Sequence, residues 1–517
     1  MKINWLAVIL VFALVVRIVG LDRFNSSLNV DEVAIGYDAY SILKTGRDHL
    51  GNFLPVVFPS LGDYKPGLYI YVVAIFEALF GLNEYAVRLP SALAGTFSVY
   101  LIYRLVSNIY KEKKTAIAAS LIYATMPLTI VLSRGGYESN FALALLLAGL
   151  VWLQNQIDKE GHYWALLLFP LSMYTYHNEK LLAMIMLVGI IWWNRFEIKK
   201  RIKVFSVWML IMLVFCVPLL QTINPTSQTR ARDKFILNDP LISSLEGNAK
   251  IGAAISIGMS RYLQAFDPTA YFAKGMNMTF TNNMDMGWIG IWLFPIFGIG
   301  LWAFFSLSRK KLNIVSWKTL VLLTLITPIP SAITMDDYHN FRLLPISVIL
   351  SVIAGLGLTK LMQIKMGKIL GVSLVMINVV MFVLMYTVVY QSEKSHWQFD
   401  PMKEVALYAH SLSGDTKVLI DPRFGKEGPY IFGVPEFYLL FYGKVDPNEY
   451  RQTKRDGGFG KFDFRNVDWQ VERKLANTVI IASEWSITEG TYDKNKLLKK
   501  FSFVDGQTAY LAVSSDK

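Results

Sequence analysis

Long apolar runs alternate with short polar segments from the N-terminus to about residue 390. A helix needs roughly 20 mostly apolar residues to cross a bilayer. The pattern therefore predicts a helical membrane part over residues 1–390 with eleven crossings. The predicted crossings are residues 3–20, 86–107, 114–133, 139–156, 162–176, 179–194, 203–222, 286–306, 317–334, 342–360 and 368–390.

One further apolar run, residues 67–82, is not predicted to cross. It is short and carries Glu77. Counting it as a crossing would also move the basic segment 111–114 to the opposite side and invert every later loop. We therefore expect a juxtamembrane or partly inserted helix over residues 67–82.

The distribution of charge supports this topology. Only 17% of the residues are charged, against roughly 25% in a soluble protein, and the formal net charge is +12. Cytoplasmic loops of membrane proteins are enriched in Lys and Arg. With the N-terminus inside, eleven crossings place on that side the basic segments 111–114, 195–203, 309–318 and 360–368. The positive charge is thus assigned to membrane topology, and no nucleic-acid partner is expected.

The N-terminus and the cysteine content set two further limits. Residues 3–20 follow a lone lysine, as in a signal peptide, but no small-residue cleavage pattern follows them, so a retained helix is favoured. The single cysteine, Cys216, lies in an apolar run and excludes a disulfide within the chain.

Three long segments are predicted to face the non-cytoplasmic side: an outer loop over residues 21–85, a second over residues 223–285, and the tail over residues 391–517. The tail is charged, rich in glycine and contains short β-like runs at residues 417–420, 478–482 and 509–513. The predicted fold class is an all-α polytopic membrane domain followed by a small C-terminal extracytoplasmic α/β domain.

Acids, cations, histidines and tyrosines gather at the outer ends of the predicted crossings, whereas the opposite loops are mostly plain Lys/Arg clusters. Ionisable groups at membrane depth are costly and tend to mark function. The outer groups are Asp31-Glu32, Tyr37-Asp38, Asp63-Tyr64-Lys65, Arg134 with Glu138, the segment 176–180 with His177 and Lys180, and the segment 336–342 with His339 and Arg342.

Each group also has a simpler explanation. Asp31 and Glu32 suit the N-terminus of a juxtamembrane helix, because carboxylates stabilise that end. Arg134 and Arg342 are explained equally well as arginines whose long side chains extend to the membrane–water interface. His177 and His339 are explained equally well as histidines that pack against neighbours and form ordinary hydrogen bonds. None of these explanations accounts for the concentration of all groups on one face.

Together such side chains suit transfer of a group from a lipid phosphate. A carboxylate in a partly dry cavity can act as a general base on a hydroxyl or an amine. Arginine, lysine and histidine can bind a phosphate and stabilise it as it leaves. A phosphate with a long apolar tail is the substrate that an enzyme meets at this depth.

At these residues the sequence resembles glycosyltransferases of the C-type membrane fold (GT-C), and within them the superfamily of protein O-mannosyltransferases and aminoarabinose transferases. These enzymes use polyprenyl-phosphate sugars. The ordered set that carries the resemblance is Asp31-Glu32 with Tyr37-Asp38, Gly62-Asp63-Tyr64-Lys65-Pro66-Gly67, the segment 80–91, Ser133-Arg134 with Tyr137-Glu138, and His339 with Arg342.

The resemblance implies roles for individual residues. Asp31 matches the acid that activates the acceptor, with Glu32 beside it and Glu138 as the acidic position of the second outer loop. Lys65 matches a cation that meets the carrier phosphate. The resemblance further suggests Arg134, His177, Lys180, His339 and Arg342 as carrier or sugar contacts, and Tyr37, Asp63 and Tyr64 as substrate contacts.

Two positions depart from the family pattern. The family often has two prolines where this chain has Pro66-Gly67, and often arginine where this chain has Lys180. Lysine keeps the charge but loses the forked donor geometry of arginine.

The expected function is an inverting transfer of a hexose or pentose, mannose among them, from a polyprenyl or dolichyl monophosphate to an acceptor hydroxyl on the extracytoplasmic face of the cytoplasmic membrane. The acceptor is a protein, a lipid or a glycan. No particular cofactor is predicted; Asp, Glu and His near one another permit a divalent metal, but no spacing is diagnostic for one. The alternatives are a lipid-linked sugar flippase or transporter, and transfer from a diphosphate carrier as in oligosaccharyltransferases, whose Trp-Trp-Asp-Tyr-Gly signature the chain lacks.

Overall fold

A computed structural model describes residues 4–22, 27–60, 63–159, 161–223, 234–275, 286–306, 312–335, 340–397, 399–424, 431–432, 434–488 and 490–515. The chain forms two compact units. The helical unit consists of Met1–Val19, Val56–Tyr69 and Arg88–Met385. The tail unit consists of Gly20–Pro55, Ile70–Val87 and Tyr386–Lys517, so most of the first outer loop folds together with the tail.

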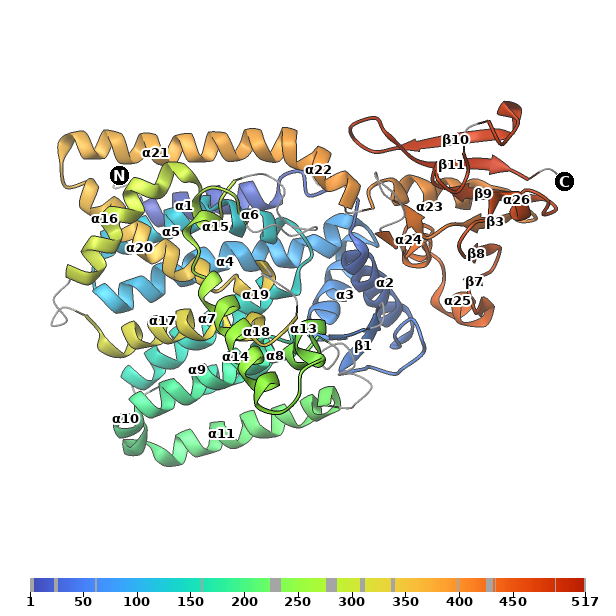
Figure 1. Ribbon diagram of the computed structural model, residues 1–517. Coiled ribbons are helices and arrows are strands. Elements are labelled where there is room, and N and C mark those ends of the chain that lie inside the picture. The colour runs from blue at the N-terminus through green and yellow to red at the C-terminus, as the bar shows by residue number, and fades with distance from the viewer. Residues whose placement is uncertain are drawn as a thin grey trace. The chain divides into compact units, whose positions relative to one another are not determined.

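Every predicted crossing coincides with a helix or with two consecutive helices (Figure 1). The main helices of these segments are α1 (Trp5–Ile18), α4 (Glu84–Tyr110), α5 (Lys113–Thr125), α6 (Pro127–Arg134), α7 (Glu138–Asp158), α8 (Leu168–Met173), α9 (Glu179–Trp193), α11 (Ile202–Cys216), α16 (Phe294–Ser306), α17 (Ile314–Ile326), α18 (Ile329–Ala332), α20 (Ile346–Leu361) and α21 (Lys365–Leu384).

In the described part of the chain, five helices are long and apolar enough to cross a membrane, or six if the pair α5 and α6 forms one bent span. That pair bends by 56° where Pro127 begins α6, although one continuous crossing was expected over residues 114–133. Proline lacks the amide hydrogen that would continue the preceding helix. Several other predicted crossings are shorter apolar helices, so the count of eleven stays a prediction.

Glycines set the closest helix contacts in the helical unit. A Cβ atom on Gly300 of α16 would lie 1.9 Å from the carbonyl oxygen of Ile353 in α20, and one on Gly357 would lie 1.8 Å from that of Ile296. The opposite side of α20 meets α5, where a Cβ on Gly355 would lie 2.6 Å from the Cα of Ala119. Small residues allow membrane helices to approach in this way.

The second outer loop is partly helical in its described residues. It contains α13 (Pro240–Ser243), α14 (Gly247–Gln264) and α15 (Pro268–Phe272). Arg261 of α14 forms an ion pair with Asp239, with 3.1 Å between Nη2 and Oδ2, and donates to the carbonyl oxygen of Thr334. The loop is therefore fixed to the end of the α17–α18 segment.

In the tail unit, the first outer loop contributes α2 (Val30–Thr45) and most of α3 (Leu68–Phe80). The helix predicted over residues 67–82 is thus present as α3. α2 begins at a reciprocal cap between Asn29 and Glu32 and ends at Gly46, whose φ of 66° suits glycine. α2 packs on α24 (Pro435–Tyr442), where a Cβ on Gly36 would lie 2.5 Å from the ring of Phe441.

The tail contains both helices and a β-sheet. Its seven-stranded sheet has the order β10-β11-β9-β3-β8-β7-β6. The three predicted β-like runs are β3 (Lys417–Ile420), β9 (Thr478–Ala482) and β11 (Thr508–Ser514). The remaining strands of the sheet are β6 (Lys454–Arg455), β7 (Gly458–Phe459), β8 (Phe462–Phe464) and β10 (Leu497–Ser502).

The centre of this sheet is parallel, because β3 pairs in parallel with both β8 and β9. Parallel strands are covered on both faces, and β9 is accordingly buried along its whole length. The helices of the domain are α22 (Tyr390–Trp397), α23 (Pro401–Ser411), α24, α25 (Pro447–Thr453) and α26 (Trp469–Glu472).

Candidate functional site

Lys65 lies on a β-hairpin of the helical unit. Strands β1 (Val57–Ser60) and β2 (Asp63–Pro66) pair antiparallel with Phe58 opposite Lys65. A side chain at the next position would crowd the hairpin, since a Cβ on Gly67 would lie 2.7 Å from the ring of Phe58 and 3.0 Å from the carbonyl oxygen of Val56. The Pro66-Gly67 departure from the family pattern therefore has a local packing reason.

Lys65 of the hairpin forms an ion pair with Glu138 at the start of α7. Their Nζ and Oε1 atoms are 3.7 Å apart, and the two side chains are only 15% and 13% exposed. Glu138 begins α7, where its carboxylate also suits the helix N-terminus. An ion pair this well shielded from water retains a substantial part of its attraction.

Tyr176 lies near four charged side chains of the helical unit. Its hydroxyl lies within electrostatic reach of Arg342, Glu138, Glu179 and Lys65. The structure thus collects residues from the hairpin, from α7, from the turn before α9 and from α19 (Asn340–Leu343). We call Lys65, Glu138, Tyr176, Glu179 and Arg342 the charged cluster.

His177 links the hairpin to α9 beside this cluster. Its Nε2 lies 2.6 Å from the carbonyl oxygen of Tyr64, and the Lys180 ammonium lies 3.1 Å from its Nδ1. The pattern fits an imidazole that donates from Nε2 and accepts at Nδ1. Arg342 donates to the hydroxyl of Thr334, and its backbone carbonyl accepts from the Asn178 amide at 3.5 Å.

Arg134 binds the C-terminal end of α1. It is 4% exposed and donates to the carbonyl oxygens of Val16 and Val19 at 2.7 and 3.0 Å. These carbonyls lie at the end of α1, where helices leave acceptors unpaired. Its predicted role as a carrier contact stays a prediction.

In the tail unit, Asp31 and Glu32 differ sharply although they are neighbours. Glu32 is 1% exposed, and its carboxylate accepts from the amide of Asn29 at 2.9 Å while its own amide donates to the Asn29 side chain. Asp31 is exposed. The capping explanation therefore holds for Glu32, and Asp31 is the acid that water or a substrate can reach.

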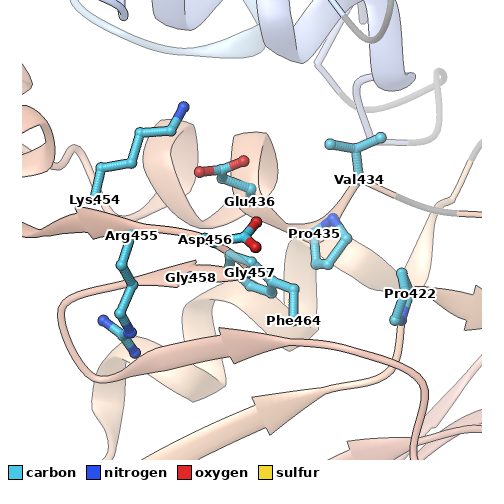
Figure 2. A pocket seen from close by; sticks show the side chains of 10 residues that line it. All are labelled: Pro422, Val434, Pro435, Glu436, Lys454, Arg455, Asp456, Gly457, Gly458 and Phe464. Atoms are coloured by element: carbon cyan, nitrogen blue, oxygen red, sulfur yellow. The ribbon is translucent and has the colours of Figure 1, made fainter.

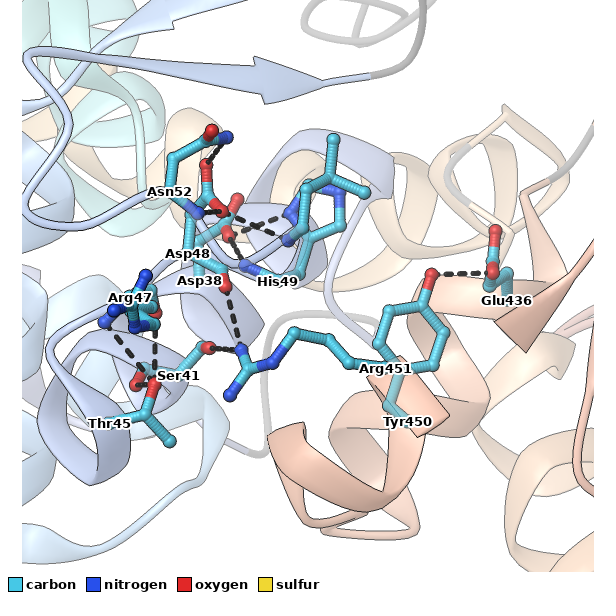
Figure 3. Close-up of polar contacts among 11 residues, drawn as sticks. Asp38, Ser41, Thr45, Arg47, Asp48, His49, Asn52, Glu436, Tyr450 and Arg451 are labelled. Carbon is cyan, nitrogen blue, oxygen red and sulfur yellow. Dashed lines mark hydrogen bonds and ion pairs between the residues drawn. The ribbon is translucent and has the colours of Figure 1, made fainter. Parts of the chain in front are cut away.

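Further along α2, Asp38 takes part in a network of hydrogen bonds with the residues after the helix (Figure 3). Asp38 accepts from the amide and from Nδ1 of His49 at 2.9 and 2.8 Å. Burial lowers the pKa of His49, but the charge and hydrogen bond of Asp38 and the charge of Asp48 outweigh it, so the pKa is raised overall. Arg451 of α25 donates to the carbonyl oxygen of Asp48 at 3.0 Å and so ties the loop to the tail.

The remaining predicted substrate contacts have different surroundings. Tyr37 is fully buried, and its hydroxyl donates to the carbonyl oxygen of Val445 at 3.1 Å. Tyr64 is half-buried, and Asp63 pairs with Ser60 at the tip of the hairpin. His339 lies outside the described residues.

Two members of the charged cluster were not predicted as site residues. Tyr176 and Glu179 belong to the polar turn at 176–180, which was recognised, but the inward orientation of each depends on where α8 ends and α9 begins. Glu179 is 2% exposed, and its Oε2 has no hydrogen-bond partner among the described residues. Over the same residues, no group of three or more His, Cys, Asp and Glu side chains is arranged to hold a metal ion.

Comparisons with known proteins agree with the resemblance seen in the sequence. Residues 64–221 match the family of dolichyl-phosphate-mannose-protein mannosyltransferases. The chain is 26% identical over 251 residues to a putative mannosyltransferase of Bacillus subtilis (strain 168), an alignment that covers 47% of this chain and 35% of that protein. It is 30% identical over 109 residues to an undecaprenyl phosphate-alpha-4-amino-4-deoxy-L-arabinose arabinosyl transferase of Pseudomonas fluorescens, covering 21% of this chain and 19% of the relative.

Among solved structures, the chain is similar to ArnT from Cupriavidus metallidurans, crystallised with undecaprenyl phosphate. The TM-score is 0.55 at 12% sequence identity, and the alignment covers 98% of both chains. This likeness confirms the C-type fold. The family match and the curated relatives confirm the predicted resemblance to PMT-like transferases. The chain spans about a third or less of the length of the curated relatives it matches.

Proposed function

We propose that this chain is a multi-pass membrane glycosyltransferase that moves a sugar from a polyprenyl or dolichyl monophosphate to an acceptor hydroxyl on the extracytoplasmic face, with inversion. The observation that carries the proposal is the charged cluster, in which Lys65 and Arg342 lie beside two acids and a tyrosine within a helical unit of the C-type fold. Relatives that act on undecaprenyl-phosphate and dolichyl-phosphate sugars support the choice of donor.

The cations of the cluster suit the phosphate of the donor. When the bond between the anomeric carbon and the phosphate oxygen breaks, the phosphate gains negative charge. Lys65 is positioned by the Glu138 pair, and a positioned ammonium in a shielded site stabilises such charge more strongly than water does. Arg342 offers the forked donor geometry that phosphate oxygens accept.

We assign Asp31 as the general base that takes the proton of the acceptor hydroxyl. The family resemblance is what assigns it this role: the acceptor oxygen bonds to the anomeric carbon as the bond to the phosphate oxygen breaks, the acceptor proton passes to the Asp31 carboxylate, and the single displacement inverts the anomeric configuration. Glu32 is a positioning residue, because its cap on Asn29 fixes the first turn of α2 and therefore the direction of Asp31.

The test is sugar transfer in proteoliposomes that contain the full chain. Polyprenyl-phosphate donors carrying radiolabelled mannose or 4-amino-4-deoxy-arabinose are supplied with acceptors extracted from the source membrane. Asp31→Asn should lower turnover at least about 100-fold, the usual contribution of a general base. Asp22→Asn changes an exposed acid earlier in the same loop and should stay within about twofold.

Two results would contradict the proposal. Unchanged turnover in Asp31→Asn would show that Asp31 is not the general base. Donor binding without turnover by the unaltered chain would favour a lipid-linked sugar flippase or transporter. Running each assay with and without EDTA decides whether transfer needs a divalent metal.

A further inference from the structure

A cavity of about 430 Å³ lies in the α/β domain of the tail. It forms where the parallel strands end: Arg423 follows β3, Val467 and Asp468 follow β8, and Trp485 and Ser486 follow β9. The chain passes from β3 to β8 on one side and then returns to β9 on the other. Open α/β sheets bind ligands outside the carboxyl ends of their strands at such a switch point.

The floor of this cavity is a hydrogen-bonded network around Asp421, which is fully buried. Its carboxylate accepts from Arg423 Nε at 3.0 Å and Nη2 at 2.7 Å, and also from the amide of Val467 and the hydroxyl of Ser486. Arg423 is fixed further by the carbonyl oxygen of Val467 at 3.1 Å. Polar groups held in this way are arranged before any ligand arrives.

Two indole rings and several short polar side chains complete the cavity. Trp469 is nearly buried, and its Nε1 donates to the carbonyl oxygen of Thr491 at 3.0 Å. Trp485 is half-exposed. The polar side chains that line the cavity beside them are Asp468, Gln470, Ser486, Thr488 and Thr491.

The charge of the lining argues against an anionic ligand. Among the described lining residues, Arg423 is the one cation, and its guanidinium is neutralised by a bidentate contact with Asp421. The Nε and Nη2 atoms, the side of a guanidinium that could hold a phosphate bidentately, already donate to Asp421. Flat apolar rings beside hydroxyl, amide and carboxylate groups match a ligand whose faces carry C–H groups and whose edge carries hydroxyls.

We propose that this cavity, bounded by Trp469 and Trp485, is a saccharide-binding site for a neutral sugar unit. The sugar places a C–H face on the Trp485 ring and its hydroxyls toward Gln470, Thr488 and Thr491. Binding itself is independent of the transfer reaction. Assigning the bound unit to a glycan acceptor, rather than to the sugar of the donor, rests on the proposed function.

A second cavity in the same domain fits this ligand less well. It has a volume of about 510 Å³ and lies near α24 and the β6–β7 hairpin (Figure 2). Its lining includes Lys454, Asp456 and Glu436 but no tryptophan among the described residues. Glu436 already accepts from the Tyr450 hydroxyl at 2.7 Å, and Arg455 turns away to bond β8.

The test is saturation-transfer NMR on the full chain in detergent, without carrier lipid. The probes are mannotriose, maltotriose and triacetylchitotriose, with inorganic phosphate as the anionic probe. At least one trisaccharide should bind, and Trp485→Ala should weaken it at least tenfold. Val471→Ala alters an exposed apolar residue of α26 outside the cavity and should leave binding unchanged. Gln470→Ala, at an exposed position, should weaken binding severalfold. It replaces Trp485→Ala as the test variant if Trp485→Ala fails to fold.

The proposal is overturned if no trisaccharide binds the unaltered chain, if phosphate displaces the bound sugar, or if binding survives Trp485→Ala. A rise in the acceptor KM of Trp485→Ala with an unchanged donor KM identifies the acceptor as the source of the sugar, and the reverse identifies the donor. Asp31→Asn should keep full saccharide binding, so failure of the transfer mechanism and failure of this site give different results.

Discussion

At the scale of single residues, helix geometry gives different surroundings to adjacent acids. Successive side chains on a helix point about 100° apart. Glu32 therefore turns back to Asn29 while Asp31 faces outward. The sequence identified the pair and the possibility of a cap, but it did not decide which acid caps. That choice depends on the helix starting after Asn29, and helix boundaries are the least certain part of a sequence pattern.

The pair of Asp38 and His49 predicts a pH-dependent stability for the tail unit. The pKa of His49 is raised, so the folded state holds the imidazolium more tightly than the unfolded chain does. The resulting stabilisation is fully present below about pH 6.5, the unfolded value, and is lost as the pH rises through the higher folded value. Burial and, to a smaller extent, Lys454 lower the pKa of His49, while Asp38 and Asp48 raise it by a larger amount.

Limited proteolysis of the tail unit between pH 6 and pH 9 measures this effect. The unaltered chain should become easier to cleave as the pH rises, and His49→Gln should be destabilised by about 1.5–3 kcal/mol at pH 6 and lose the trend, because a hydrogen bond between charged groups is removed. His162→Gln, at an exposed position of the helical unit, is the control. An equal pH trend in His49→Gln would rule out this histidine as the source.

At the scale of elements, the apolar pattern located the helices well but not their breaks or contacts. Hydrophobic runs report burial in lipid or protein, and they say little about where the axis bends. Pro127 within the run 114–133 was a visible signal for the bend between α5 and α6. The contact of Gly300 with Ile353 joins helices some fifty residues apart, and the sequence alone did not show which glycines meet a neighbour.

Two glycines of α16 give a matched test of that packing. Gly298 has no atom within 4 Å of the Cβ position, whereas a Cβ on Gly300 would lie 1.9 Å from a backbone oxygen. Gly298→Ala should leave stability unchanged or raise it by up to about 1 kcal/mol. Gly300→Ala should cost about 1–3 kcal/mol through overpacking. Thermal unfolding in detergent compares the two, and equal midpoints would contradict the described contact between α16 and α20.

At the scale of the whole molecule, most of the first outer loop folds with the tail as one unit, whereas Val56–Tyr69 belongs to the helical unit. The Tyr438 hydroxyl donates to the carbonyl oxygen of Leu28 at 2.8 Å, and Arg451 reaches Asp48. Asp31 and the tail therefore belong to one compact unit, and the eleven-crossing prediction assigns both to the same side of the membrane. No local pattern predicted this association, because its partners are about 400 residues apart. The last stretch of this unit runs from Tyr386 to Lys517, and the domain boundary at 390 stays a prediction.

The sidedness of the loops can be measured with single cysteines. In a Cys216→Ser background, Lys114→Cys and Lys494→Cys each add one thiol at an exposed position. An impermeant maleimide added to intact cells should label Lys494→Cys and spare Lys114→Cys, and lysis should expose the latter. Labelling on the same side for both, or the reverse pattern, would refute the eleven-crossing topology.

The central claim is that the charged cluster binds the phosphate of a lipid carrier through Lys65. The most direct measurement is an experimental structure of the full chain with a bound polyprenyl phosphate. The claim predicts phosphate density within about 4 Å of the Lys65 ammonium, the range of an ion pair, with Arg342 close enough to contribute. Phosphate density on other cations, such as the basic segment 195–203, with Lys65 still paired to Glu138 and remote from it, would contradict the claim.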